Sequence, residues 1–182
     1  LLSWSNENSE HVPFMIWIEP KEWVEQSTDN TAIVELQNLL DSIEQEIIEF
    51  WPRNKTITPD DVRGNSETLS RAIMENGWPL LDDSRGKAMF ILLSSGELRQ
   101  SYHDKFPGLI EAKMFTMSET GSSEAAIFSD TDPVGNADEI IALVKDGYIV
   151  RSRADNAENG EADENNKTRL NAALSVGAHS IS

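Results

Sequence analysis

The sequence predicts an α/β fold in which parallel strands alternate with helices. Continuous apolar runs at 13–18 and 88–93 are typical of strands buried on both faces of a sheet. Segments of helical periodicity separate such runs along the chain, which predicts right-handed βαβ units. Neither a repeat nor a linker divides the 182 residues, which are enough for one domain with a core. We therefore expect residues 1–182 to form a single domain.

The helices are expected where apolar residues recur at steps of three and four. The clearest is 31–50, where Leu36, Leu40 and Ile47 share one face. Gly147 is expected at the C′ position of a helix over 138–146, and Gly177 at the end of a helix over 168–176. Shorter helices are predicted over 66–76 and 98–106, whereas 57–64 is rich in turn residues.

Five or six strands are expected between these helices. They fall at 13–18, 88–93, 112–117, 125–128, 148–154 and 179–182. A TIM barrel needs eight strands and typically about 250 residues. The sequence therefore predicts the later part of a TIM barrel, lacking the first strands and the end of the last one.

Composition limits the function classes. The formal net charge of −17, from 32 acidic and 15 basic residues, argues against a nucleic-acid partner and against a basic membrane-docking face. Part of the acid lies in 155–164, which its composition predicts to be a solvated loop. The absence of cysteine excludes disulfides, thiol catalysis and thiolate metal sites.

Glu19 and Lys21 follow the first predicted strand at its carboxyl end. Their spacing of two places both side chains on the same side of an extended chain. The carboxyl ends of parallel strands are where α/β sheets and barrels hold their active sites. A carboxylate there can hold a divalent cation and a lysine can face a phosphate. The alternative is a salt bridge at the end of the strand.

Seven strings in order resemble one known family. They lie at 13–21, 57–64, 76–81, 85–87, 114–116, 147–155 and 169–178, and include ITPDDVRG and GYIVRSRAD. Together they are similar to the bacterial calcium-dependent phosphoinositide-specific phospholipases C, which are TIM barrels of the phospholipase C-like phosphodiesterase type. The resemblance implies a secreted or periplasmic hydrolase of lipid metabolism that cleaves the phosphodiester of phosphatidylinositol or a related inositol phosphodiester. Its contact with the membrane surface would be transient.

The resemblance also implies Ca2+ as cofactor and Glu19 as a ligand to it. It places the two catalytic histidines, which act as general acid and base, on strands upstream of Leu1. The three histidines present are not good candidates. His11 and His179 lie at the amino ends of predicted strands, and His103 lies on a helix expected at the surface.

Arg151 and Arg153 are the expected substrate contacts, together with Lys21 and Asp155. Alternate positions on one strand point the same way, so both guanidinium groups face one side. In the barrel interior such charges must be paired or face the substrate, because an unpaired buried guanidinium is very costly. Arg153 is nearer the carboxyl end, where Asp155 is positioned to hold it. The alternative is an Arg–Asp layer in the barrel core.

Two other functions remain open. One is a glycerophosphodiester phosphodiesterase-like enzyme, which also places a Glu and a Lys at a strand end. The other is a non-catalytic barrel fragment that acts as a binding module. The sequence upstream of Leu1 would distinguish them, because an enzyme of this type needs histidines and acidic residues on its first strands.

Overall fold

The computed structural model describes residues 1–20 and 30–182, within which it has six parallel strands. They form two three-stranded ladders, β1-β2-β3 and β4-β5-β6, and a parallel bridge between Met117 and Ile127 joins the two. The described strands do not close into a ring, so the predicted fold, a partial parallel barrel, is confirmed. The strands are β1 (Phe14–Ile18), β2 (Ala88–Leu92), β3 (Met114–Thr116), β4 (Ile127–Ser129), β5 (Ile149–Ser152) and β6 (Ser180–Ile181).

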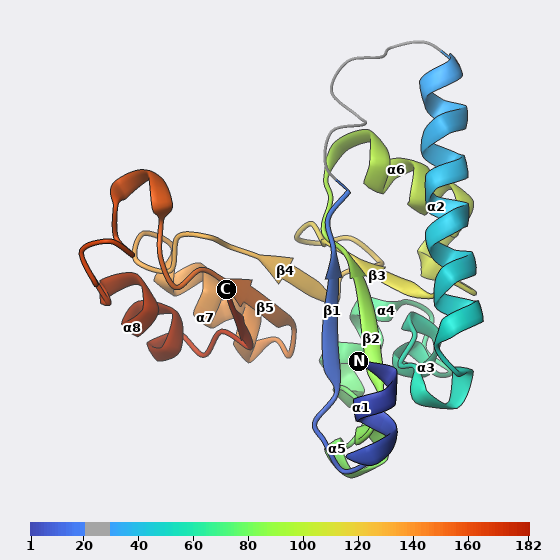
Figure 1. Ribbon diagram of the computed structural model, residues 1–182, viewed down its shortest axis with the longest axis horizontal. Helices are drawn as coiled ribbons and strands as arrows, with labels where there is room; N and C mark the ends of the chain where they lie inside the picture. The colour runs from blue at the N-terminus through green and yellow to red at the C-terminus, as the bar shows by residue number, and fades with distance from the viewer. Residues whose placement is uncertain (21–29) are drawn as a thin grey trace.

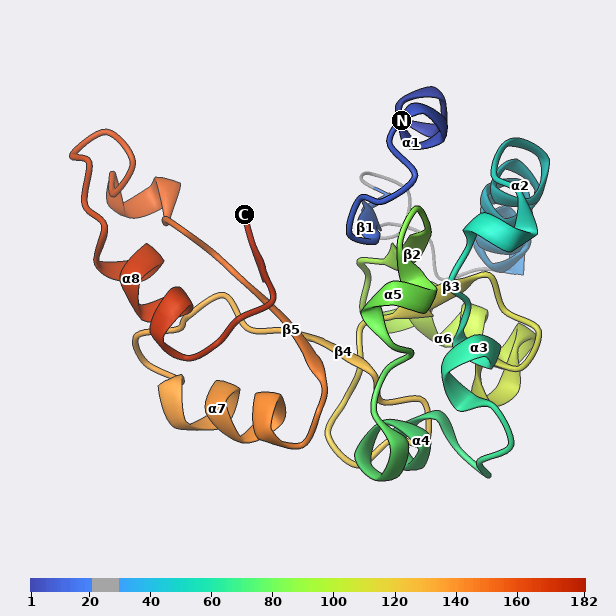
Figure 2. The ribbon, with the colours of Figure 1, turned by 90° about the horizontal axis from the view of Figure 1, so that it is seen from below.

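Helices cover the outer side of both ladders (Figures 1 and 2). The long helices that the sequence predicts are all present, within one to three residues of their expected ends at most termini. The described α-helices are α1 (Leu2–Glu7), α2 (Asn30–Phe50), α3 (Pro59–Arg63), α4 (Leu69–Asn76), α5 (Leu81–Ser84), α6 (Gly96–Lys105), α7 (Ala137–Lys145) and α8 (Thr168–Ser175). Short 3-10 turns lie at η1 (Arg53–Lys55), η2 (Pro107–Leu109) and η3 (Ala157–Asn159).

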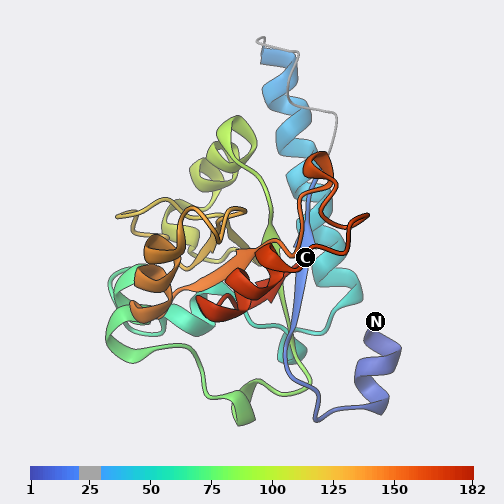
Figure 3. The ribbon, with the colours of Figure 1, turned by 90° about the vertical axis from the view of Figure 1, so that its left-hand side faces the viewer.

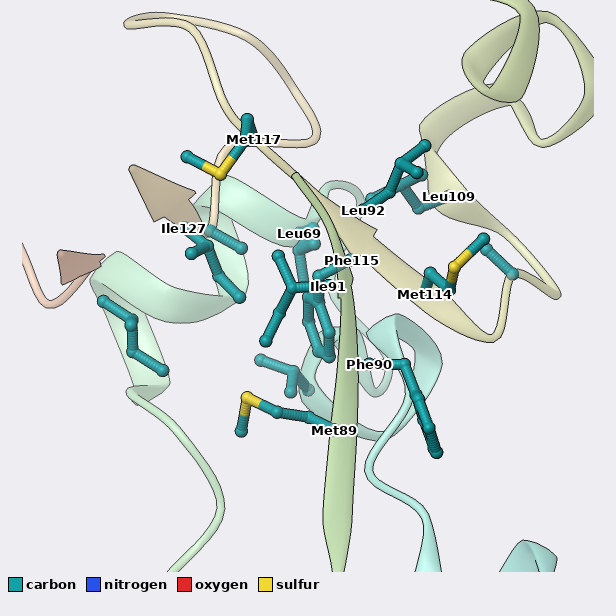
Figure 4. Close-up of a cluster of buried hydrophobic side chains, with 14 of the residues drawn as sticks. Leu69, Met89, Phe90, Ile91, Leu92, Leu109, Met114, Phe115, Met117 and Ile127 are labelled. Atoms are coloured by element: carbon teal, nitrogen blue, oxygen red, sulfur yellow. The ribbon is translucent and has the colours of Figure 1, made fainter. Parts of the chain in front are cut away.

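Strand β2 is the centre of the first ladder and is buried along its whole length. Its side chains alternate, so Met89 and Ile91 lie on one side and Phe90 and Leu92 on the other (Figure 4). The first pair faces the barrel interior and the second faces the helices. Burial on both faces explains why this strand reads as a continuous apolar run rather than as an alternating one.

The outer layer of the first ladder is formed by α2 and α6, which lie side by side (Figure 1). Leu36, Leu40 and Ile47 of α2 are buried, as the helical period predicts. The ring of Trp51, just after α2, meets the ring of Phe90 edge-on with centroids 5.8 Å apart. This contact fixes the end of α2 on β2.

The second ladder is covered by α7 and α8, which flank β5 in Figure 2. Helix α7 ends in the left-handed cap expected from Gly147, whose φ is +90°. The amide of Gly147 donates to Val144 O at 3.1 Å, and the next amide, that of Tyr148, donates to Leu143 O at 3.1 Å. This cap turns the chain directly into β5. Gly177 caps α8 in the same way, with a φ of +78°.

Three short helices differ from the prediction. The stretch 57–64, expected as turns, contains α3, which starts with a capping box between Thr58 and Asp61. Helices α1 and α5 were not predicted, because each has six residues or fewer and no helical period can be recognised over that length. None of the described helices combines the length and the apolar composition that crossing a membrane requires.

Gly86 lets two distant segments meet at the amino end of the barrel. Its φ is +70°, and a Cβ atom at this position would lie 2.5 Å from Ser9 O. Its amide donates to His11 O at 2.9 Å, and Ser5 Oγ donates to its carbonyl at 3.2 Å. Glycine is required here because any side chain would push the N-terminal segment away from the start of β2.

Candidate functional site

The candidate site lies inside the partial barrel, where β1 faces β5. Both strands run in the same direction, so their carboxyl ends open on the same edge. At the amino end, Met15 of β1, Met89 of β2 and Ile149 of β5 line one cavity of about 260 Å³. Two residues further along, the Arg151 guanidinium lies over the Trp17 ring, 5.6 Å from its centroid. Figure 3 looks at the molecule from the side of β5 and the C-terminus.

Arg151 is held by residues from three strands. Its Nη1 donates to Ser129 Oγ at 3.3 Å and its Nη2 donates to Ser182 Oγ at 2.9 Å. These serines come from the end of β4 and from the residue after β6, the two neighbours of β5 in the ladder. The Trp17 ring lies on its other side, from β1. Two hydroxyls and one aromatic face therefore orient the guanidinium.

The electrostatics of this layer are dominated by positive charge. Burial lowers the pKa of Arg151, the charge of Arg153 lowers it further, and the Glu19 carboxylate partly offsets both effects. The three charged groups are thus close enough to affect one another. Arg151 remains a cation at neutral pH in any case, since a guanidinium cannot be deprotonated there. An anion entering this edge would meet two guanidinium groups and one carboxylate.

Glu19 fits one position of a calcium site. Its side chain is exposed at the carboxyl end of β1, and a carboxylate is the hard oxygen ligand that calcium prefers. Over residues 1–20 and 30–182, no group of three or more histidine, aspartate and glutamate side chains is placed to hold a metal ion. Glu19 therefore fits as one ligand of a larger set and does not form a complete site with its described neighbours. Lys21, the predicted phosphate contact, lies outside the described residues.

Arg153 and Asp155 follow β5 toward the open edge. Arg153 is exposed, as expected for a residue that meets a ligand, and Asp155 is half-buried. The expected ion pair between them is not formed in the part of the chain that the structure describes. The chain bends after Arg153, and the amide of the next residue, Ala154, donates to Ser182 O at 2.8 Å.

Each of the three histidines has a partner in the fold. His11 stacks on Phe14 at the start of β1, with ring centroids 4.2 Å apart. His179 Nδ1 accepts a bond from Val150 N at 3.2 Å. His103 was expected at the surface, but it is half-buried and its Nε2 lies 2.8 Å from Thr116 Oγ1 on the outer side of β3. That none of the three is catalytic stays a prediction.

The structure adds residues that the sequence did not single out. Trp17, Ser129 and Ser182 form the cradle of Arg151. One signal was present, since Ser129 directly follows the strand predicted at 125–128 and Ser182 lies within the strand predicted from 179. Only the register of β4, β5 and β6 shows that both hydroxyls reach the same guanidinium.

Comparison with known proteins gives a consistent result. The family model described as "Phosphoinositide phospholipase C, Ca2+-dependent" matches residues 1–182. Comparison with curated sequences gives no significant match. Among solved structures, the calcium-dependent phosphoinositol-specific phospholipase C of the Gram-negative bacterium Pseudomonas sp., in the structure titled "apo form, myoinositol complex", is similar with a TM-score of 0.60 at 16% identity. The match covers 92% of this chain and 61% of that one.

A second similar structure comes from another bacterium. The Ca2+-dependent phosphatidylinositol-specific phospholipase C of Streptomyces antibioticus has a TM-score of 0.59 at 14% identity, over 84% of this chain and 56% of that one. At these identities the structures demonstrate a shared fold, and the family model carries the family assignment. The chain spans about three-fifths of the length of the structures it matches.

Proposed function

The chain belongs to the Ca2+-dependent phosphoinositide phospholipase C family, and from this premise we propose that it forms the phosphate-binding side of an enzyme that cleaves an inositol phospholipid. The observation that carries the proposal is that the Arg151 guanidinium of β5 lies over the Trp17 ring of β1, where the charges of Arg153 and Glu19, just beyond the ends of these strands, act on it. The family consists of calcium-dependent phospholipases. This chain spans only 61% of the length of the Pseudomonas structure. The enzymatic activity is therefore proposed for the whole protein and not for residues 1–182 alone.

Each charged residue has a separate role in this proposal. Arg153, exposed at the end of β5, binds a non-bridging phosphate oxygen, and Arg151 below it orients the site and adds to its positive potential. Lys21 and Asp155 complete the contacts to the phosphate and the inositol ring. Glu19 holds calcium, which when bound neutralises charge that develops on the phosphorus oxygens.

Proton transfer requires groups beyond these residues. An inositol hydroxyl that attacks the phosphorus must lose its proton, and the leaving alcohol must gain one. His11, His103 and His179 are engaged elsewhere in the fold. We therefore place the general base and the general acid on histidines N-terminal to Leu1, in the first strands of the barrel.

The expected membrane contact and location of the protein follow from its net charge and from its need for calcium. A chain with a formal net charge of −17 is repelled by anionic bilayers, so its contact with the membrane is transient or bridged by calcium. A secreted or periplasmic location supplies the calcium that the cytosol lacks.

The test is release of inositol phosphate from phosphatidylinositol by the full-length protein that carries this sequence, with calcium and with a chelator. We expect activity only with calcium. Glu19→Gln should raise the calcium concentration for half-maximal activity by at least about tenfold, because one charged ligand is lost. Glu7→Gln, an equal change of charge on the exposed surface of α1, should leave it unchanged.

Three results would contradict parts of the proposal. Faster cleavage of glycerophosphodiesters than of phosphatidylinositol would indicate the related phosphodiesterase instead. Activity of residues 1–182 alone would show that the catalytic histidines are misplaced. Absence of activity in the full-length protein would favour a barrel that only binds.

A further inference from the structure

Arg169, in the first turn of α8, is the centre of an ion-pair network at the carboxyl edge of the second ladder. Its Nε donates to Glu161 Oε2 at 2.9 Å and its Nη2 donates to Glu161 Oε1 at 3.1 Å, a two-bond fork. Its Nη1 donates to Thr131 O at 3.0 Å and to Asp132 Oδ1 at 3.1 Å. One side chain thus connects α8, the segment after β4 and the segment after β5.

The Arg169–Glu161 pair is more enclosed than an ordinary surface ion pair, whereas the Asp132 side chain is 52% exposed. The side chains of Arg169 and Glu161 are only 12% and 14% exposed. The bond from Arg169 lowers the pKa of Glu161 and so favours the charged carboxylate. The segment 155–164, expected from its composition to be a solvated loop, is therefore fixed at Glu161.

Both ends of the network reach the segments beside the candidate site. Glu161 Oε2 also accepts a bond from the amide of Asn156 at 2.9 Å, and Asn156 follows Asp155 directly. On the other side, Asp130 Oδ1 accepts from the amide of Asp132 at 2.9 Å. The Asp130 amide donates in turn to Arg151 O at 3.0 Å.

We propose that Arg169 is a positioning residue for the reaction. It binds no substrate itself. Through Asp132 and Glu161 it holds the segments that follow β4 and β5, so that Arg153 and Asp155 keep their places at the open edge. Its role rests on the proposed phosphodiesterase function. Because Glu19 follows β1, in the other ladder, we expect substrate binding to depend on Arg169 and calcium binding not to depend on it.

The test compares Arg169→Gln with a matched arginine in the full-length protein. Arg71 on α4 also lies between two carboxylates, Glu75 at 2.9 Å and Glu67 at 3.6 Å, but it is 55% exposed. We expect Arg169→Gln to raise KM for a soluble inositol phosphodiester about tenfold, the order of magnitude of coupling within a contacting network. We expect kcat to change less than about threefold and the calcium dependence to stay the same. Arg71→Gln should behave as the wild type.

Hydrogen exchange gives a readout independent of turnover. In Arg169→Gln, amides at 130–136 and 154–161 should exchange faster, and those of β1 and β2 should be unchanged. Glu161→Gln should reproduce both effects, and the double variant should be little worse than either single one, since both changes break the same fork. Arg169→Lys should rescue KM only in part, because an ammonium group cannot form the two-bond fork.

The outcomes separate this inference from the proposed function. An unchanged KM in Arg169→Gln, in a wild-type background that turns over substrate, overturns the positioning role and leaves the function intact. Unchanged exchange at 130–136 and 154–161 overturns the role as well. A wild-type protein that neither turns over the phosphodiester nor binds inositol phosphate rejects the proposed function, and the positioning role falls with it.

Discussion

At the scale of single residues, Arg151 illustrates how the interior accommodates charge. A guanidinium removed from water usually needs a carboxylate partner, because desolvation is costly. Here its described hydrogen bonds go to two neutral hydroxyls, and the Glu19 carboxylate acts on it through the electrostatic field. Its charge is therefore only partly compensated within the site. The remaining positive potential favours binding of a phosphate. This would explain in functional terms why a charged guanidinium is kept in the interior despite the free-energy cost of removing it from water.

His103 leads to a prediction about pH at the same scale. Burial lowers its pKa and the charge of Arg99 lowers it further, while Glu124, Asp104 and Glu119 act in the opposite direction. In the unfolded chain the imidazole takes up a proton as the pH falls through about 6.5, whereas the folded protein resists protonation. Protonation then favours the unfolded state. The free energy of unfolding should therefore fall between pH 7.5 and pH 5.5.

The measurement is the urea midpoint at the two pH values, in the wild type and in His103→Gln. Glutamine can keep a hydrogen bond to Thr116 but does not titrate, so the variant should lose less stability on acidification. Desolvation of its ring lowers the pKa of His179 too, so it contributes in the same direction. An equal loss of stability in both proteins would contradict this account of His103.

At the scale of elements, the capping box of α3 organises the ITPDDVRG segment. The Thr58 amide donates to Asp61 Oδ2 at 2.8 Å, and Arg53 Nη2 donates to Asp61 Oδ1 at 2.7 Å. Thr58→Ala should lower the free energy of unfolding by about 1 kcal/mol, the usual cost of a lost N-cap. Thermal or urea unfolding measures this change. Thr120→Ala, in an exposed turn, is the control and should have an effect below about 0.5 kcal/mol.

Elements with a strong period were predictable, and elements fixed by distant contacts were not. The apolar spacing of α2 and the glycine caps of α7 and α8 are local signals, so these helices appear where expected. Helix α1 has no side-chain cap of its own, and it is fixed by Ser5, which is bonded to Gly86 in a segment 81 residues away. The box in α3 could have been recognised, but Pro59 and Gly64 made the segment resemble a turn.

The same distinction applies to the candidate site. Alternation along one strand predicts that Arg151 and Arg153 share a side, and this stays a prediction because Arg153 lies just beyond β5. The partners of Arg151 lie on β1, β4 and beyond β6, so they depend on strand order and register. These are properties of the assembled sheet, and no local pattern in the sequence encodes them.

At the scale of the whole molecule, β1 forms the outer edge of the first ladder in the described structure. Phe14 N donates to Lys87 O at 3.0 Å, so alternate amides of β1 point to β2, and those of Met15 and Trp17 point to the outer edge. An edge of this kind is a template for pairing with another strand. Residues 1–182 expressed alone should therefore associate in a concentration-dependent manner.

Light scattering after size exclusion measures this association. Met15→Pro removes an amide that points outward and should reduce association while the fold is kept. Ile16→Pro is the matched control, because its amide faces β2 and its loss should destabilise the fold. A wild-type chain that stays monomeric at all concentrations and unfolds cooperatively would contradict the prediction.

The narrow junction between the two ladders has a mechanical consequence. Met117 and Ile127 form the only bridge described between them, reinforced by Ser118, whose amide donates to Ile127 O at 2.8 Å. Three side-chain contacts also link the halves: Arg151 lies over the Trp17 ring, Trp78 Nε1 donates to Gly147 O at 2.9 Å, and Ser70 Oγ lies 2.8 Å from Tyr148 Oη. Force applied across this seam would load the single strand bridge and these side-chain contacts, rather than a continuous ladder of backbone hydrogen bonds. We expect a stretched molecule to part there first, into two three-stranded halves that each retain their own helices.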